Sequence, residues 1–155
     1  MRRILIDAAK CTGCKSCAVA CMQSHRSGEG SLYDIDLQSP SNESRNIILQ
    51  NSEKSYKPLF CRHCAKPQCV ATCMSGALYK NPDTGHVLYD QEKCAQCFMC
   101  VMSCPFGVLK PDRATGTYVV KCDFCVNTGS QPHCASRCPS GAIRVQEVEN
   151  TGGAK

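Results

Sequence analysis

Sixteen cysteines in a chain of 155 residues constrain this sequence more than any other feature. Cysteine makes up about a tenth of the residues, a share typical of disulfide scaffolds and metal carriers. The chain has no Trp, and only five Tyr and four Phe. A hydrophobic core this thin needs cross-links, and bound metal then contributes directly to the free energy of folding. We therefore expect the cysteines to hold the fold together.

The start of the sequence indicates which kind of cross-link to expect. It reads MRRILIDAAKC, in which Arg2 and Arg3 are followed by only three apolar residues. An export signal needs a longer apolar region, and no apolar stretch in the chain approaches the length of a transmembrane helix. We therefore predict a soluble, cytoplasmic protein without a direct membrane anchor. Thiols stay reduced in the cytoplasm, which favours metal sites over disulfides.

The spacing of the cysteines distinguishes between metals. They form four motifs of four: Cys11, Cys14, Cys17 and Cys21; Cys61, Cys64, Cys69 and Cys73; Cys94, Cys97, Cys100 and Cys104; Cys122, Cys125, Cys134 and Cys138. Motifs one and three have the spacing C-x2-C-x2-C-x3-C of bacterial ferredoxins, in which three thiolates bind one 4Fe-4S cluster and the fourth binds another. A zinc-bound structural scaffold is the competing class, but zinc sites use C-x2-C pairs that are separated by longer loops.

Motifs two and four are expanded versions of the same arrangement. Four residues precede Cys69 and eight precede Cys134, and lengthening a loop between anchored ends costs little free energy. Sixteen thiolates then predict four 4Fe-4S clusters with no open iron position for a substrate. The sequence also has no nucleotide-binding fingerprint and no recognisable catalytic constellation. It therefore predicts a non-catalytic electron-transfer protein.

An internal repeat supports this interpretation. A glycine and an apolar pair follow motifs two, three and four, and the turns NPDTG and DRATG lead into strands that reach the next cysteine. The N-terminal RRILI looks like such a strand without its hairpin partner. This pattern predicts an α+β fold with two ferredoxin-like halves made of small β-hairpins and short helices. The predicted parts are an outer half (1–21 and 105–149), an inner half (61–104), an insertion (22–60) and a flexible tail (150–155).

The order of the sixteen cysteines resembles a known family over about residues 3–147. These are the four-cluster iron–sulfur subunits associated with molybdopterin oxidoreductases, hydrogenases and carbon monoxide dehydrogenases. The resemblance implies that motifs one and four share two clusters, and that motifs two and three share the other two. The implied ligand sets are Cys11, Cys14, Cys17 and Cys138; Cys21, Cys122, Cys125 and Cys134; Cys61, Cys64, Cys69 and Cys104; Cys73, Cys94, Cys97 and Cys100.

Four further segments indicate a partner. NESRN, PLFCRHC, CMSGAL and CFMCVMSCPFGVLKPD are most similar to the small ferredoxin-like subunit that accepts electrons from a nickel carbon monoxide dehydrogenase. The resemblance implies a relay from that enzyme to an acceptor such as a hydrogenase or a flavin-dependent NAD(P) oxidoreductase. Carriers for a tungsten aldehyde oxidoreductase, a formate dehydrogenase or a hydrogenase are the alternatives. Stacking of the chain on itself into longer wires stays open.

The charge balance argues against nucleic acid as a partner. The formal charge is +5, but each oxidised cluster with its four thiolates adds about −2, which gives a total of about −3. The basic residues Arg62, Lys66, Lys93 and Lys121 lie beside ligands in the sequence. Positive charge at these positions would favour the reduced cluster, but we expect these side chains to be solvated surface charges.

The four histidines are not expected to bind metal, since the sixteen thiolates complete four clusters. His63 and His133 lie next to cysteines and could tune a cluster by hydrogen bonding. His25 and His86 lie in polar stretches, and we expect both on the surface.

The insertion contains LYDIDLQ (32–38) and NIILQ (46–50), which predict two strands. It either covers the first clusters or docks the catalytic subunit. Near motif three, we expect Phe98, Met99 and Met102 to pack against a cluster. CAQC in that motif lacks the glycine of CTGC, which could alter an amide contact to a cluster sulfur.

Overall fold

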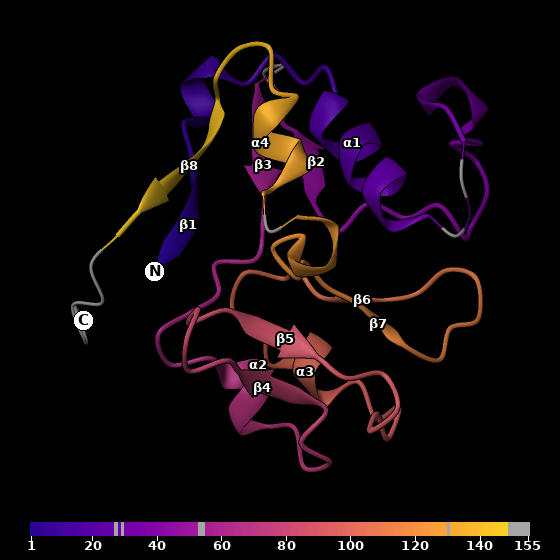
Figure 1. Cartoon of the computed structure of the whole chain (residues 1–155), viewed down its shortest axis with the longest axis vertical. Helices are drawn as coiled ribbons and strands as arrows, with labels where there is room; N and C mark the ends of the chain where they lie inside the picture. Colours follow the sequence, from indigo (N-terminus) through magenta and orange to yellow (C-terminus); the bar gives the residue numbers. More distant parts are fainter. Residues whose placement is uncertain (27, 29, 53–54, 130, 149–155) are drawn as a thin grey trace.

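The structure is a computed structural model that describes residues 1–26, 28, 30–52, 55–129 and 131–148. It contains short helices and two-stranded antiparallel sheets, and it is therefore a mixed α+β fold, as predicted (Figure 1). The predicted flexible tail, residues 150–155, lies outside the described residues.

The described elements follow one another in a regular order. The strands are β1 (Arg2–Ile6), β2 (Ile47–Gln50), β3 (Tyr56–Leu59), β4 (Leu78–Lys80), β5 (Val87–Tyr89), β6 (Lys110–Pro111), β7 (Val119–Val120) and β8 (Ile143–Glu147). The α-helices are α1 (Ser16–His25), α2 (Gln68–Ala71), α3 (Met99–Met102) and α4 (His133–Ser136). The 3-10 turns are η1 (Ala8–Lys10), η2 (Leu32–Asp34) and η3 (Val126–Thr128).

Two of the predicted hairpins form around polar turn residues. In the turn between β4 and β5, the side chain of Asn81 accepts hydrogen bonds from the backbone N–H groups of Asp83 and Thr84. Between β6 and β7, the carboxylate of Asp112 accepts hydrogen bonds from backbone N–H groups that include those of Thr115 and Tyr118. Asn and Asp favour turns because their side chains bond to the backbone a few residues further on. Both hairpins are therefore fixed by local sequence.

The strand β1 finds its partner at the other end of the chain. It pairs antiparallel with β8, with Ile6 opposite Ile143 and Arg2 opposite Glu147. Figure 1 shows these two strands beside α1 and α4, while α2, α3, β4 and β5 form a separate group. The N-terminal strand, for which the sequence showed no hairpin partner, thus pairs with the last strand that the structure describes.

The insertion contains one of its two predicted strands. NIILQ forms β2, which pairs with β3. The strand predicted at 32–38 is wrong, because Leu32–Asp34 forms the turn η2 instead. The backbone N–H of Ser31 donates to Asp34, and the Ser31 hydroxyl accepts from the backbone N–H of Tyr33. This capping box stabilises a helical turn in place of the predicted strand.

The core consists of two hydrophobic clusters, and cysteines belong to both. The inner cluster has the buried residues Cys69, Leu78, Val87, Cys100, Val108, Leu109 and Val119. The outer cluster has the buried residues Cys17, Phe60, Cys134 and Ile143. The cysteines thus supply part of the buried contact area that the small number of aromatic residues does not provide.

Several residues lie at a different depth from the one predicted. Lys66 and Lys93 are exposed as expected, but Lys121 is only 4% exposed. The surface prediction for His86 is wrong, since its exposed fraction is 5% and its ring stacks on Phe124. Sequence neighbours do not reveal such burial, because segments far apart in the chain create it.

Two methionines and His25 also differ from expectation. Met99 and Met102 are 47% and 81% exposed, although we expected both to pack against a cluster. Phe98 packs against the inner hydrophobic cluster, and its expected contact with an iron–sulfur cluster stays a prediction. His25 is half-buried, not a surface residue, because α1 turns its ring toward Asp123.

We predict that the pairing of β1 with β8 depends on Ile143, which is 3% exposed in the outer cluster. Ile143→Ala removes buried methyl and methylene groups and leaves a cavity, at a cost of about 2 to 4 kcal/mol. Arg144→Ala on the exposed side of the same strand is the matched control. The measurement is the rate at which the visible absorption bleaches in guanidinium under anaerobic conditions. Equal rates for both variants would contradict this role of Ile143.

Candidate metal centres

Each motif opens with a C-x2-C knuckle, and the four knuckles share one backbone feature. The residue before the second cysteine has a positive φ in all four motifs: +70° at Gly13, +43° at His63, +57° at Gln96 and +62° at Phe124. Residues other than glycine adopt this region at a cost, and such strain gathers at functional sites. Gln96 keeps the knuckle geometry, and its N–H donates to Cys94 Sγ at 3.4 Å. The missing glycine of CAQC therefore does not abolish an amide contact to sulfur.

A helix begins one residue before the third cysteine of every motif. The third cysteines are all buried and are Cys17 in α1, Cys69 in α2, Cys100 in α3 and Cys134 in α4. The knuckle and the first helical turn together direct the first three sulfurs of a motif toward a common space.

The fourth cysteine of each motif lies with the sulfurs of a different motif. Three pockets are each lined by four thiols, which we call sets A, B and C. Set A is Cys11, Cys14, Cys17 and Cys138; set B is Cys21, Cys122, Cys125 and Cys134; set C is Cys61, Cys64, Cys69 and Cys104. In set D, Cys73, Cys94 and Cys100 interact electrostatically, and the exposed Cys97 follows in the same motif. The structure therefore brings together all four thiols that the resemblance grouped in each of sets A, B and C, and three of the four in set D.

The sets follow one another in a row. Cys134 of set B lies near enough to Cys17 of set A for their charges to interact, and Cys122 of set B interacts with Cys61 of set C in the same way. Cysteines of sets C and D belong to or pack against the inner hydrophobic cluster. The order in space is therefore A, B, C, D.

The ionisation of these thiols shows why they suit iron. Burial raises the pKa of Cys17 and Cys69 to about 11, and it raises the pKa of Cys122 to about 12. Neighbouring cysteines raise these values further, since like charges repel. Several thiolates in one buried pocket are stable only beside a strong positive charge, which iron supplies. Four soft sulfur donors in an apolar pocket fit a 4Fe-4S cluster.

Backbone and serine groups stabilise the sulfurs closer to the surface. Leu78 N–H donates to Cys73 Sγ at 3.4 Å, and the Ser75 hydroxyl lies 3.6 Å from the same sulfur. Burial opposes ionisation of Cys73, but these hydrogen bonds outweigh it and lower the pKa of its thiol. Ser140 lies 3.7 Å from Cys138 Sγ in the equivalent position after motif four. Such contacts tune the potential of a bound cluster.

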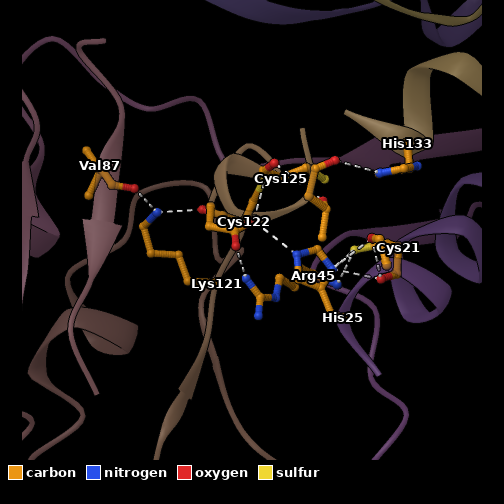
Figure 2. A network of polar contacts seen from close by, with 11 residues as sticks. Cys21, His25, Arg45, Val87, Lys121, Cys122, Cys125 and His133 are labelled. Atoms are coloured by element: carbon orange, nitrogen blue, oxygen red, sulfur yellow. Dashed lines mark hydrogen bonds and ion pairs between the residues drawn. The ribbon is translucent and has the colours of Figure 1, made fainter. Parts of the chain in front are cut away.

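A polar network lies beside set B (Figure 2). His25 Nδ1 lies 3.7 Å from Cys21 Sγ, and its Nε2 lies 3.1 Å from the Asp123 carboxylate. Arg45 forms an ion pair with Asp123 at 2.7 Å, and its backbone N–H donates to Cys21 Sγ at 3.2 Å. Burial disfavours charge on His25, but Asp123 and Cys21 outweigh it and raise the pKa of His25 to about 10.

Sequence reasoning missed this network. The only local signal was the four-residue spacing of Cys21 and His25, which places both on one face of α1. Of the two histidines beside ligands, His63 accepts a hydrogen bond from the Val87 N–H at 3.0 Å. His133 Nε2 lies 3.3 Å from the Thr128 carbonyl. One ring nitrogen of each of these two histidines is thus engaged with a backbone group.

Comparison with protein families agrees with this chemistry. Residues 52–148 match the model described as the 4Fe-4S dicluster domain, and residues 2–23 match the model described as the 4Fe-4S binding domain.

Three similar proteins are named as subunits or chains of oxidoreductases. The chain is 35% identical to the NADH-dependent phenylglyoxylate dehydrogenase subunit beta of Aromatoleum evansii, over 91% of this chain and 29% of that protein. It is 35% identical to the probable anaerobic dimethyl sulfoxide reductase chain YnfG of Escherichia coli (strain K12), over 93% and 72% of the two chains. It is 31% identical to the thiosulfate reductase electron transfer subunit PhsB of Salmonella typhi, over 96% and 77%. The chain thus spans less than a third of the first of these relatives.

These findings decide two predictions. The predicted cofactor, the 4Fe-4S cluster, is confirmed, and so is the predicted role as a non-catalytic electron-transfer subunit. The more specific prediction of a carbon monoxide dehydrogenase partner has no support in these three relatives. In the part of the chain that the structure describes, no helix has the length and apolar character needed to cross a membrane.

We predict that Gly13→Ala weakens set A. A methyl group at Gly13 would collide with the ring of Tyr56, and φ at this position is +70°. Gly76→Ala is the matched control, because φ is +69° and open space surrounds that position. The measurement is iron retained per chain after exposure to a chelator. Gly13→Ala should lose iron faster than Gly76→Ala, and Tyr56→Ala in the same chain should restore retention. If both glycine variants lose iron equally, the collision has no effect.

Proposed function

Because this chain belongs to the 4Fe-4S dicluster domain family, we propose that it relays single electrons through four 4Fe-4S clusters from one partner protein to another. One partner is a catalytic oxidoreductase subunit, and the other is a downstream electron carrier or acceptor. The observation that carries this proposal is the continuous row of thiol sets A to D.

A bound 4Fe-4S cluster accepts and releases one electron without changing its protein ligands. The chain supplies four thiolates to each set, so no iron position is left for a substrate. Its apolar core side chains exclude water from the inner sulfurs, and its N–H groups stabilise negative charge on sulfur.

The two ends of the row lie closest to solvent. Cys14 of set A and Cys97 of set D are exposed, whereas the second cysteines of the middle sets are half-buried or buried. Electron transfer between proteins needs short distances, so we assign the exchange with partners to these two ends. The direction of flow between them is not part of the proposal.

We also propose the division into two ferredoxin-like halves, with one change of boundary. The outer half contains sets A and B, and contacts between β1 and β8 and between α1 and α4 support it. The inner half contains sets C and D. Val108, Leu109 and Val119 belong to the inner hydrophobic cluster, so the β6–β7 hairpin packs with the inner half. The boundary therefore lies near residue 120 and not at residue 105.

The catalytic partner is best described by class. The relatives include chains of a dimethyl sulfoxide reductase and a thiosulfate reductase, which favour a terminal reductase or a related oxidoreductase as partner. Three finer points stay predictions from the sequence: carbon monoxide dehydrogenase as the catalytic partner, the cytoplasmic location and the kind of downstream acceptor. Whether the chain stacks on itself stays open.

We expect that the substrate of the catalytic partner will change the visible absorption of the chain. The purified chain is added, oxidised or dithionite-reduced, to anaerobic extract of the native cells, and its visible absorption is followed. Dimethyl sulfoxide, thiosulfate, carbon monoxide, formate, an aldehyde and hydrogen are added separately. With the partner's substrate, the chain should bleach or regain its colour at a rate well above the rate without substrate. Bleaching by carbon monoxide would restore the original partner prediction, and no response to any substrate would contradict a partner of these classes.

We predict that pairs of cysteine variants report the ligand sets through iron content. The intact chain should carry about sixteen iron and sixteen sulfide atoms. Cys17→Ala with Cys138→Ala removes two ligands of set A and should leave about twelve iron atoms. Cys134→Ala with Cys138→Ala removes ligands of sets A and B and should leave about eight. If each cluster were bound by the four cysteines of one motif, the iron contents of the two double variants would be exchanged. Zinc without sulfide in the intact chain would contradict the electron-transfer proposal.

A further inference from the structure

Lys121 is a buried cation at the junction of the two proposed halves. Its exposed fraction is 4%, and its ammonium donates to the carbonyl of Cys122 at 2.6 Å and to the carbonyl of Val87 (Figure 2). Val87 belongs to β5 in the inner half, whereas Cys122 is a member of set B in the outer half. Neither carbonyl carries a net charge, so these two hydrogen bonds do not neutralise the lysine.

Lys121 lies beside both middle sets. Its ammonium donates to the carbonyl of Cys122, which lines the set B pocket, and to the carbonyl of Val87, which lines the set C pocket. Cys122 also interacts with Cys61 of set C. Lys121 therefore lies where sets B and C approach each other, at the one step of the row that joins the two halves.

Two histidines and Phe124 pack together at this junction. His86 stacks on Phe124 at 4.0 Å between ring centroids, and His63 lies 5.0 Å from His86. Burial and the charge of Lys121 lower the pKa of both histidines.

Three other charges lie close to the junction. Arg2 lies over the Phe124 ring at 5.8 Å, Arg3 acts on Cys64 of set C, and Asp123 is paired with His25 and Arg45. Asp123 is thus already compensated, whereas the hydrogen bonds that the Lys121 ammonium donates go to two uncharged carbonyls beside sets B and C.

We propose that Lys121 is a positioning residue for electron transfer, whose buried ammonium holds the two middle clusters at a higher reduction potential than they would otherwise have. This inference rests on the proposed ligand sets. A cluster with four thiolates carries about −2 when oxidised, and uptake of one electron from a partner protein adds one more negative charge. A fixed positive charge between sets B and C favours the state with that added electron.

The burial of Lys121 determines the size of this effect. Solvent and salt screen charges at the surface, but they screen a buried charge much less. Lys80 provides a contrast within the same structure. Its ammonium donates to the carbonyls of Cys64 at 3.1 Å and Ala65 at 2.9 Å, close to set C, but it is only half-buried. Lys80 has the same charge and two similar hydrogen bonds, so it is a matched control.

The test measures the midpoint potential of each cluster in the isolated, fully loaded protein, by a redox titration monitored by electron paramagnetic resonance. Lys121→Gln removes the charge and keeps a donor, whereas Lys121→Arg keeps the charge. In Lys121→Gln, two of the four couples should become harder to reduce, with about a tenfold lower ratio of reduced to oxidised cluster at a fixed potential. This corresponds to about 59 mV for a one-electron couple. Lys121→Arg and Lys80→Gln should leave all four couples close to those of the unchanged protein.

Each result decides the proposal. Unchanged couples in a Lys121→Gln protein with full iron content would overturn it, as would equal shifts after Lys80→Gln. If Lys121→Gln does not bind its clusters but Lys121→Arg does, the result supports the need for the positive charge. If neither variant binds its clusters, the proposal is overturned. An intact chain with fewer than four clusters would instead contradict the proposed function, so the two failures are distinguishable.

Discussion

The structure depends on the cost of placing thiolates close together inside an apolar core. Cys17, Cys69 and Cys134 are buried, and burial raises the pKa of each of their thiols. Without iron these thiols resist ionisation, and with iron the same sulfurs become the centre around which both hydrophobic clusters pack. Folding and cluster binding are therefore coupled, which explains how a chain with so few aromatic residues can maintain a defined core.

The spacing C-x3-C sets the distance between neighbouring clusters. The third and fourth cysteines of a motif belong to different sets, as with Cys17 in set A and Cys21 in set B on α1. Four residues of helix rise by about 6 Å, so each motif ties two neighbouring sets together at short range. No motif links sets B and C in this way. That step depends on tertiary contacts alone, among them the hydrogen bonds of Lys121 and the stacking of His86 on Phe124.

Features encoded within a few residues could be predicted from the sequence, and features made by distant segments could not. The hairpins at Asn81 and Asp112 follow from side chains that bond to their own turn. Lys121, by contrast, is buried because it reaches Val87, 34 residues away in the sequence. The alternation in residues 32–38 was misleading because a strand also needs a partner. The cysteine motifs predicted the metal, but the crossed grouping came only from resemblance, since spacing does not show which motifs meet.

The two interpretations of the insertion apply to different parts of it. Asn46 donates to the carbonyl of Cys17 at 3.2 Å, and Glu43 binds Lys110 at 2.9 Å and the backbone N–H of Arg113 at 2.7 Å. These contacts tie residues 43–46 to both proposed halves, which favours the covering interpretation for this part. Residues 31–38 make mainly local hydrogen bonds, and Tyr33 and Leu37 are 95% and 57% exposed. Because an apolar side chain gains nothing from full exposure to water, the docking prediction narrows to this short segment near set A, where Leu32 lines the same pocket as the exposed Cys14.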